Sequence, residues 1–381
     1  MAGYDMAVFA ETRFSGGSAA AVIADISAMS AAGATVALVP VTSRFFDGAP
    51  DVPNSAVLAL ADLGGVSLQT APQQITARAA FFHQPQPIYA GVAERIALRA
   101  ERAVIVAHHP PFRGDGSLEY DPLRTVRLID ASFGVRPWCA PVSGVVRQQL
   151  RSCAPRIRLS SEVWVNRVDP ENWQPGPPAF SNQTAIVGRH GRADPLKWPD
   201  RARDIEAPLD PGPGWQARVL GCPEAELRAR GAEPSAWDCV PFGSVPVQEY
   251  LQGLDVFSYF YSDRWAEAFG RTVLEAMLME RPCVLDPRLE PTFGPHARFC
   301  KPQEAPALIR RLRETPEATQ SQCRDVRERV AKSFASAEVP RQFERLLKDP
   351  GSRSRTGPKS ASPLVALRKT GGLALRRAKM T

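Results

Sequence analysis

Short apolar runs alternate with longer, partly polar segments along most of this chain. Residues 6–10 predict a buried strand, a loop with Gly16 and Gly17 follows, residues 18–32 are rich in alanine and predict a helix, and residues 35–41 predict a second strand. A strand, a glycine loop, a helix and another strand in this order form a βαβ unit with parallel strands and a right-handed crossover. The chain therefore begins as an α/β domain.

The same alternation continues through both halves of the chain. The first half contains further predicted strands at residues 57–60 and 103–107. The second half contains predicted strands at residues 184–188, 217–221, 256–260 and 283–285. Repeated strands and helices in both halves predict two doubly wound parallel sheets. Because ligands of such sheets bind at the carboxyl ends of the strands, we expect a site in a cleft between two domains.

A proline-rich stretch at residues 169–182 separates the two halves and suits a linker. We therefore predict a first domain at residues 1–175 and a second domain at residues 176–350. The remaining residues, 351–381, are rich in serine, glycine and basic side chains, and this composition predicts a disordered tail.

The formal net charge of +7 comes from this tail. Residues 351–381 contain eight basic residues and no acidic one, which leaves 39 basic residues against 40 acidic ones in the rest of the chain. A nearly neutral body does not predict a nucleic-acid groove. The tail mixes apolar and basic residues at 364–369 and 373–377, so it could lie on an anionic membrane surface, or it could only keep the chain soluble.

The cysteines and the apolar segments indicate the cellular compartment of the protein. The seven cysteines are odd in number and include no Cys-x-x-Cys pair, which argues against a disulfide framework and a structural zinc site. The chain starts without a basic leader segment and contains no stretch of about 20 apolar residues. We expect a cytoplasmic protein, with peripheral contact at the inner face of the membrane as a further option through the tail.

The densest set of chemically useful residues follows the predicted strand at 256–260. Glu267 comes first, Gly270 next, and Glu275 lies in the first turns of a predicted helix. Backbone N–H groups at a helix start favour a phosphate, and carboxylates accept hydrogen bonds from sugar hydroxyls. Two glutamates at this spacing, taken alone, are more often part of a solvated helix face.

The context of this pair resembles the donor-binding block of retaining glycosyltransferases with the GT-B fold, family 4 in particular. The spacing Glu267-x7-Glu275 matches, as do Phe269, Gly270 and the strand at 283–285. The resemblance implies that Glu267 holds hydroxyls of the transferred sugar and that Glu275 binds the ribose of the nucleotide. It also implies that Phe269 and Gly270 present backbone N–H groups to the donor.

A second block, at the start of the second domain, is similar to the same family. Gly188-Arg189 and Lys197 resemble its Gly-Arg pair and the lysine downstream. A leaving nucleoside diphosphate develops negative charge, which Arg189 and Lys197 would neutralise. As isolated residues, both would be read as surface charges.

The first domain resembles the family less specifically. The loop with Gly16 and Gly17 is similar to the glycine loop that approaches the donor diphosphate, although it also suits an ordinary turn between a strand and a helix. His108 and His109 end the strand at 103–107 and resemble the family's histidine near the reacting sugar. The strand register favours His109, with His108 as the rival, and a structural role for either is the alternative.

The resemblance implies an α/β protein with the GT-B fold, in which two Rossmann-like domains face a central cleft. It would be a hexosyltransferase that moves a sugar, with retention, from a nucleotide sugar to a sugar or lipid-linked acceptor, as in polysaccharide, cell-envelope glycan or glycolipid synthesis. The catalytic set would be Glu267, His109, Arg189 and Lys197, with Gly17 at the donor. We expect no cofactor and no metal, because the chain contains no Asp-x-Asp.

One feature departs from the family pattern. Glu280-Arg281 stands where the family has a small residue and glycine before the proline. A nucleotide-sugar epimerase or a sugar phosphorylase would share the cleft, and an inert nucleotide-sugar binding scaffold is the rival of another class. A Rossmann dehydrogenase is disfavoured because no Gly-x-Gly-x-x-Gly follows the first strand.

Overall fold

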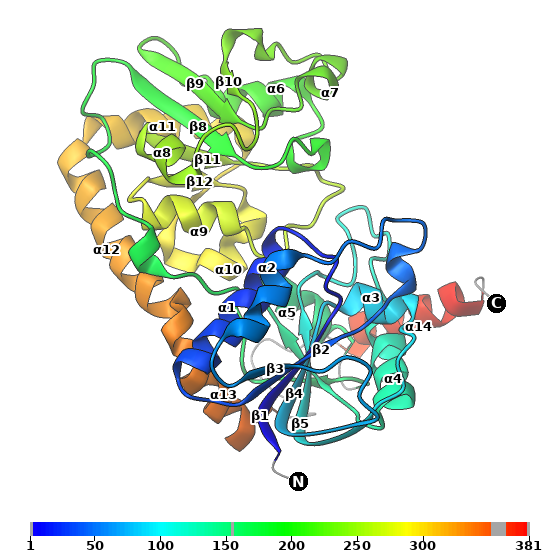
Figure 1. Cartoon of the computed structure of the whole chain (residues 1–381). Helices are drawn as coiled ribbons and strands as arrows, with labels where there is room; N and C mark the ends of the chain where they lie inside the picture. Colours follow the sequence, from blue (N-terminus) through cyan, green and yellow to red (C-terminus); the bar gives the residue numbers. More distant parts are fainter. Residues whose placement is uncertain (1–2, 154–155, 352–362, 379–381) are drawn as a thin grey trace. The chain divides into compact units, whose positions relative to one another are not determined.

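A computed structural model describes residues 3–153, 156–351 and 363–378 (Figure 1). The chain forms two compact units. The first unit contains Met1–Arg113, Ser117–Val168 and Ser336–Thr381, and the second contains Gly114–Gly116 and Asp169–Ala335.

The first unit is built on a seven-stranded sheet whose strands are all parallel. The strand order is β3-β2-β1-β4-β5-β6-β7. The strands are β1 (Tyr4–Ala10), β2 (Val36–Pro40), β3 (Val66–Leu68), β4 (Gln74–His83), β5 (Ala97–Ala107), β6 (Trp138–Pro141) and β7 (Arg158–Leu159). The central strands β1, β4 and β5 end in unbroken buried apolar runs, as expected where helices cover both faces of a parallel sheet.

Seven helices and three short 3₁₀ helices are described around this sheet. The α-helices are α1 (Gly17–Ala31), α2 (Ser55–Leu58), α3 (Pro85–Ala90), α4 (Pro122–Phe133), α5 (Gly144–Arg151), α13 (Val339–Lys348) and α14 (Pro363–Ala378). The 3₁₀ helices are η1 (Arg44–Phe46), η2 (Ala59–Asp62) and η10 (Ser336–Glu338). Local sequence sets their ends: Asp121 caps α4 through the N–H groups of Leu123 and Arg124, and Gly134 ends it in a left-handed conformation.

The second unit contains a six-stranded parallel sheet in the order β10-β9-β8-β11-β12-β13. The strands are β8 (Ala185–His190), β9 (Trp215–Leu220), β10 (Asp238–Val240), β11 (Val256–Tyr259), β12 (Cys283–Leu285) and β13 (Arg298–Phe299). The strand order reverses between β8 and β11, and such a switch point is where open α/β sheets bind ligands.

The described helices of the second unit connect these strands. The α-helices are α6 (Ala202–Glu206), α7 (Glu224–Ala229), α8 (Val247–Gln252), α9 (Arg271–Leu278), α10 (Glu290–Phe293), α11 (Ala305–Glu314) and α12 (Pro316–Phe334). The 3₁₀ helices are η3 (Pro170–Asn172), η4 (Pro195–Lys197), η5 (Ala207–Leu209), η6 (Pro234–Ala236), η7 (Pro287–Leu289), η8 (Gly294–His296) and η9 (Pro302–Glu304). Helix α9, which carries Glu275, packs against the long helix α12.

Buried charges tie the loops of the second unit to its sheet. The Asp255 carboxylate accepts hydrogen bonds from the backbone N–H groups of Phe180 and Ile186. The guanidinium of Arg281 donates to the carbonyls of Leu254, Met279 and Pro177. In the turn that departs from the family pattern, Glu280 therefore has a left-handed conformation (φ 56°). The buried Arg281 side chain holds this turn by its hydrogen bonds to the three backbone carbonyls.

The compact units differ from the predicted domain ranges at three places. Gly114–Gly116 and residues 169–175 belong to the second unit, and residues 336–350, which include α13, belong to the first. Helix α13 packs against α1, and its Phe343 ring lies 6.2 Å from that of Phe81 in β4. The apolar face of this helix is evident from the sequence, but the sheet that covers it is distant along the chain.

The expectation of a disordered tail is wrong for residues 363–378, which form α14. Alanine and leucine favour a helix here, and the Leu373 side chain is buried. The Lys369 ammonium lies 4.9 Å from the centre of the Phe112 ring. Residues 352–362 lie outside the described residues. Among the residues that the structure describes, no helix is long and apolar enough to cross a membrane.

All seven cysteines are free, in agreement with the sequence prediction. Burial is the main cause that raises the pKa of each thiol, to about 12 for Cys139 and about 11 for Cys153, Cys300 and Cys323.

Gly188 in β8 is required by close packing. A Cβ at this position would lie 2.3 Å from the Arg218 carbonyl oxygen and 2.9 Å from the Tyr250 hydroxyl. We expect Gly188→Ala to lower the free energy of unfolding by about 2–3 kcal/mol, because backbone in the sheet has to move. Gly191→Ala, where nothing lies within 4 Å, is the control and should change stability little. Denaturant titration measures both, and equal effects would contradict this account.

Candidate functional site

Glu267 lies in the loop after β11 and is the centre of a buried ion pair. Its Oε2 accepts a hydrogen bond from the Tyr259 hydroxyl at 2.8 Å and lies 3.3 Å from the Lys197 Nζ. Burial alone would raise the pKa of Glu267, but the charge of Lys197 and hydrogen bonds from Tyr259, Lys197 and Trp265 outweigh it, so the pKa lies below its usual value. Glu267 is therefore an ionised, oriented carboxylate at neutral pH.

Arg189 follows Gly188 at the carboxyl end of β8 and is buried. Its guanidinium donates to the carbonyls of Phe260 (2.7 Å) and Lys197 (2.5 Å). The rings of Trp198 and Tyr259 lie 4.1 and 4.5 Å from its Cζ. Arg189 thus holds together the loop that carries Lys197 and the loop after β11.

Glu275 lies in α9 and is also buried. Its Oε1 accepts a hydrogen bond from Arg271 Nε at 2.9 Å, and His190 Nε2 lies 3.3 Å from its Oε2. Burial raises the pKa of Glu275, against the opposing charge of Arg271. Burial also lowers the pKa of His190 to about 3, so the contact joins a carboxylate to a neutral imidazole.

Arg271 and His190 were not predicted from the sequence. His190 directly follows Arg189 at the end of β8, and Arg271 lies four residues before Glu275 on the same helix face. The spacing of Arg271 and Glu275 is visible in the sequence, because residues four apart face the same side of a helix. The position of His190 next to Arg189 is visible there too.

Gly270 gives α9 its open start. Its φ of 84° is left-handed, and an added Cβ would lie 3.1 Å from the Phe293 ring. Both the backbone conformation and the lack of space for a side chain therefore favour glycine. No side chain among the described residues caps α9. The preceding Phe269 is buried, with its ring 5.7 Å from that of Phe334 and 6.1 Å from that of Phe293. Phe269 therefore anchors the glycine turn in the core.

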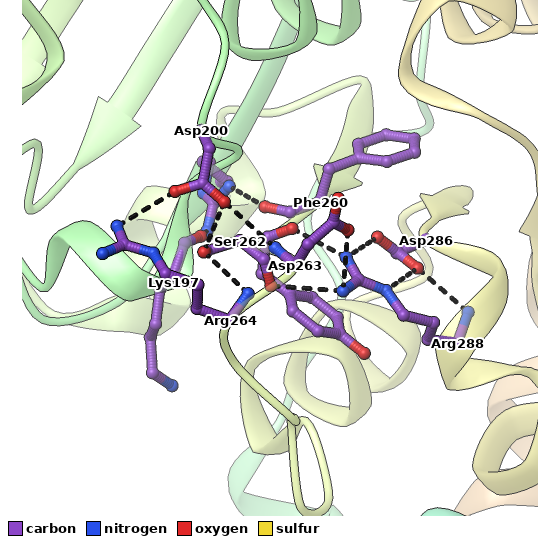
Figure 2. A network of polar contacts seen from close by, with 10 residues as sticks. Lys197, Asp200, Phe260, Ser262, Asp263, Arg264, Asp286 and Arg288 are labelled. Atoms are coloured by element: carbon purple, nitrogen blue, oxygen red, sulfur yellow. Dashed lines mark hydrogen bonds and ion pairs between the residues drawn. The ribbon is translucent and has the colours of Figure 1, made fainter. Parts of the chain in front are cut away.

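A polar network fixes the rest of the loop after β11, as Figure 2 shows. Arg288 donates to the carbonyls of Tyr261 and Ser262 and to the carboxylate of Asp286. On the other side, Asp200 accepts from the Ser262 hydroxyl at 2.6 Å and from Arg264 at 3.0 Å. Hydrogen bonds and ion pairs therefore hold the loop that leads to Glu267 from both sides.

The predicted residues of the first unit lie at the carboxyl edge of its own sheet. Gly17 is the first residue of α1, and a Cβ at Gly17 would have nothing within 4 Å. His108 is buried, and its Nε2 lies 3.0 Å from His83 Nδ1. Burial holds the pKa of His108 well below its usual value, so this pair is neutral. His109 is half-buried, and its carbonyl accepts a hydrogen bond from the Tyr120 hydroxyl.

The structure thus brings Lys197 and Arg189 close to Glu267. It also places His190, the residue after Arg189 in the chain, against Glu275. It gives His108 a packed partner in the core. Among the described residues, no group of three or more His, Cys, Asp or Glu side chains is arranged to hold a metal ion.

Structural comparison places this architecture among known folds. HepE of Anabaena, in complex with UDP and glucose, superposes with a TM-score of 0.60 at 15% identity, over 91% of this chain and 99% of that chain. A glycosyltransferase from Rickettsia africae gives 0.58 at 11% identity, over 91% and 98% of the two chains. The lipopolysaccharide outer core galactosyltransferase WaaB gives 0.54 at 13% identity, over 90% and 98%.

At these identities the similarity establishes the fold, and the predicted α/β architecture of the GT-B type is confirmed. Neither a family model nor a curated protein sequence matches this chain.

The buried histidines predict a pH dependence of stability. Burial lowers the pKa of His190 and of His83 to about 3, so the native state keeps them neutral while the unfolded chain protonates below about pH 6.5. At these two side chains the unfolded state then binds more protons, so their contribution to stability falls as the pH drops from 6.5 towards 3, whereas the raised pKa of Asp25 beside His83 acts in the opposite direction. We expect His190→Gln to reduce this slope by about 1 kcal/mol per pH unit. Denaturant unfolding at pH 7, 6 and 5 measures the slope, and an unchanged slope would contradict the burial of a neutral His190.

Proposed function

We propose that this chain is a metal-independent hexosyltransferase of family 4 type, which moves a sugar from a nucleotide sugar to a sugar or lipid-linked acceptor with retention. The observation that carries the proposal is the pair of buried carboxylates at the β8/β11 switch. Glu267 is held by Lys197 and Tyr259, and Glu275 by Arg271. The complex of HepE with UDP and glucose supports a nucleotide sugar as the ligand of this fold.

In this proposal each side chain has one task. The Glu267 carboxylate accepts hydrogen bonds from hydroxyls of the transferred sugar, and Glu275 accepts them from the ribose. The diphosphate lies at the start of α9, where Phe269 and Gly270 offer backbone N–H groups. The glycosidic C–O bond breaks with its electron pair on the diphosphate, and Lys197 stabilises that charge. The acceptor oxygen forms the new C–O bond on the face from which the diphosphate departs, and the proton of the acceptor hydroxyl passes to the departing diphosphate.

Arg189 then acts mainly as a positioning residue. Its guanidinium already donates to two backbone carbonyls, so its contribution to the leaving diphosphate passes through the orientation of Lys197 and the loop after β11. In the first unit, Gly17 would let the backbone approach the diphosphate, and His109 would lie near the reacting sugar. The core pairing of His108 with His83 favours His109 over His108 for that role.

For the location we propose a cytoplasmic enzyme whose helix α14 contacts an anionic membrane surface peripherally. Leu364 and Leu367 are exposed, and Arg368 beside them is exposed too. An amphipathic helix that mixes exposed leucines with basic residues binds anionic lipid headgroups.

Nucleotide binding tests the donor site. Thermal shift of the purified protein with UDP, GDP, ADP and their sugars should give a rise in Tm with one nucleotide family, because a ligand that binds only the native state stabilises it. We expect Glu275→Ala to remove that rise. Glu224→Ala is the matched control, since Glu224 also pairs with an arginine four residues away but is exposed. A panel without any shift would contradict a nucleotide-sugar ligand, a shift without turnover of the donor would favour the inert binding scaffold, and loss of the donor without an added acceptor would favour an epimerase.

Metal independence has its own test. With the donor that binds, we expect transfer to proceed at the same rate in excess EDTA as in Mg²⁺, because Lys197 and the start of α9 supply the charge that a metal would otherwise supply. Product formation by mass spectrometry measures the rate. Loss of activity in EDTA that Mg²⁺ or Mn²⁺ restores would refute this part of the proposal.

A further inference from the structure

The amino-terminal edge of the first unit's sheet carries a groove that the proposed chemistry does not use. Its volume is about 480 Å³, and Arg102, Arg136, Arg158 and Trp138 form part of its lining. Glu101 is the only acidic residue among the described residues that line it. We call this feature the basic groove. The residues proposed for the sugar transfer lie at the carboxyl ends of the strands, so the basic groove is a separate feature of the fold.

The basic groove forms where β5 extends beyond its neighbour in the sheet. Strand β6 begins at Trp138, which pairs with Val104, so residues 100–103 of β5 have no partner in β6. Strand β7 begins at Arg158, which pairs with Trp138. Because β5 starts earlier than the two strands beside it, the edge of the sheet has a step. The volume of the groove at this step is in the range of pockets that hold small organic ligands.

The strand register gathers two arginines and the tryptophan on one face of the sheet. Side chains alternate between the faces along a strand, and paired residues of neighbouring strands share a face. Trp138 pairs with Val104 and with Arg158, and the Cζ atom of Arg158 lies 5.7 Å from the centre of the Trp138 ring. Arg102 lies two residues before Val104 and therefore shares this face. The same alternation places the Glu101 side chain on the other face.

Backbone carbonyls hold two of the guanidinium groups at the basic groove. Arg158 Nη1 donates to the Arg136 carbonyl at 3.3 Å, so these two arginines lie next to each other. Arg102 Nη1 donates to the Glu101 carbonyl at 2.9 Å, and this is the only hydrogen bond of the Arg102 side chain among the described residues. A guanidinium carries five N–H groups in a planar fork. Arg102 therefore keeps donors for a ligand.

The arginines of the basic groove have a structural alternative. Charged side chains beside an unpaired strand edge prevent strands of other molecules from pairing with it, and this role needs no ligand. Edge protection requires only exposed charges, however, whereas Arg102 and Arg158 are half-buried and line a groove. Arginines stay protonated at any physiological pH, so the groove keeps an excess of positive charge. An anion in the groove relieves the repulsion between these charges.

We propose that the basic groove binds a phosphate-bearing ligand with at least two negative charges. A phosphate group accepts hydrogen bonds from more than one guanidinium fork at once, and such charge-assisted bonds are strong. A free phosphate compound and a phospholipid headgroup share this chemistry, and the experiments below distinguish the two sources. The inference does not depend on the proposed transferase function, because the groove contains none of the residues assigned to the donor or to the reacting sugar.

Isothermal titration of the full-length protein with inorganic pyrophosphate tests the free compound. UDP is present in excess, so that a nucleotide site is occupied. We expect pyrophosphate to bind, and Arg102→Gln and Arg136→Gln each to weaken it about tenfold, because each change removes charge-assisted hydrogen bonds. Arg99→Gln is the matched control, since Arg99 is exposed in the same strand but faces the other side of the sheet. It should change the affinity by less than about twofold.

Co-sedimentation with vesicles tests the phospholipid headgroup. The vesicles contain phosphatidylcholine with phosphatidic acid, and vesicles of phosphatidylcholine alone are the reference. If the ligand is a headgroup, Arg102→Gln and Arg136→Gln each weaken binding to the phosphatidic acid vesicles about tenfold, and Arg99→Gln does not. Vesicle binding through α14 would persist in all three variants, so it is not mistaken for binding in the groove.

The outcomes decide the proposal and the source of the phosphate. Weaker pyrophosphate binding in the two groove variants supports a free phosphate compound, and weaker binding of vesicles alone supports a headgroup. No binding of either probe, affinities that both groove variants leave unchanged, or an equal loss in Arg99→Gln would overturn the proposal and leave the arginines as protection of the strand edge. Arg136 is exposed, so Arg136→Gln should keep the Tm of the free protein and remains informative if Arg102→Gln unfolds.

Discussion

The second unit depends on charges that have been taken out of water at the carboxyl ends of β8 and β11. Removing an ion from water is unfavourable by several kcal/mol, and the free energy is recovered only where partners are placed well. Glu267 recovers it from Lys197 and Tyr259, and Glu275 from Arg271. Each carboxylate is therefore oriented by the same contacts that make its burial tolerable, and orientation before binding is what a transfer site requires.

Arginine side chains hold the loops around these carboxylates in place. Arg189, Arg281 and Arg288 each donate to backbone carbonyls of segments outside the sheets. Loop carbonyls have no strand or helix partner, and a planar guanidinium with five N–H groups can satisfy several at once. The long loops of this unit thereby keep fixed shapes without regular structure.

The sequence predicted the two parallel sheets because apolar runs of strand length recur with helices between them. Through resemblance to a known block it also assigned Glu267 and Lys197 to one donor site, and the ion pair between them is a finding of the structure. It could not predict that α13 joins the first unit or that α14 is a helix, because the surfaces that cover them are far away along the chain. The contact of His190 with Glu275 was missed for the same reason, because the neighbours of a buried side chain come together only in the folded chain.

The free cysteines have a practical consequence. Only a thiolate reacts readily with alkylating reagents, and burial raises the pKa of every one of the seven thiols. The native protein should therefore react slowly with maleimides near neutral pH. A cysteine introduced at an exposed position of either unit would be a selective attachment point for a fluorophore, so the distance between the two units could be followed as nucleotide is added, without first removing the natural cysteines.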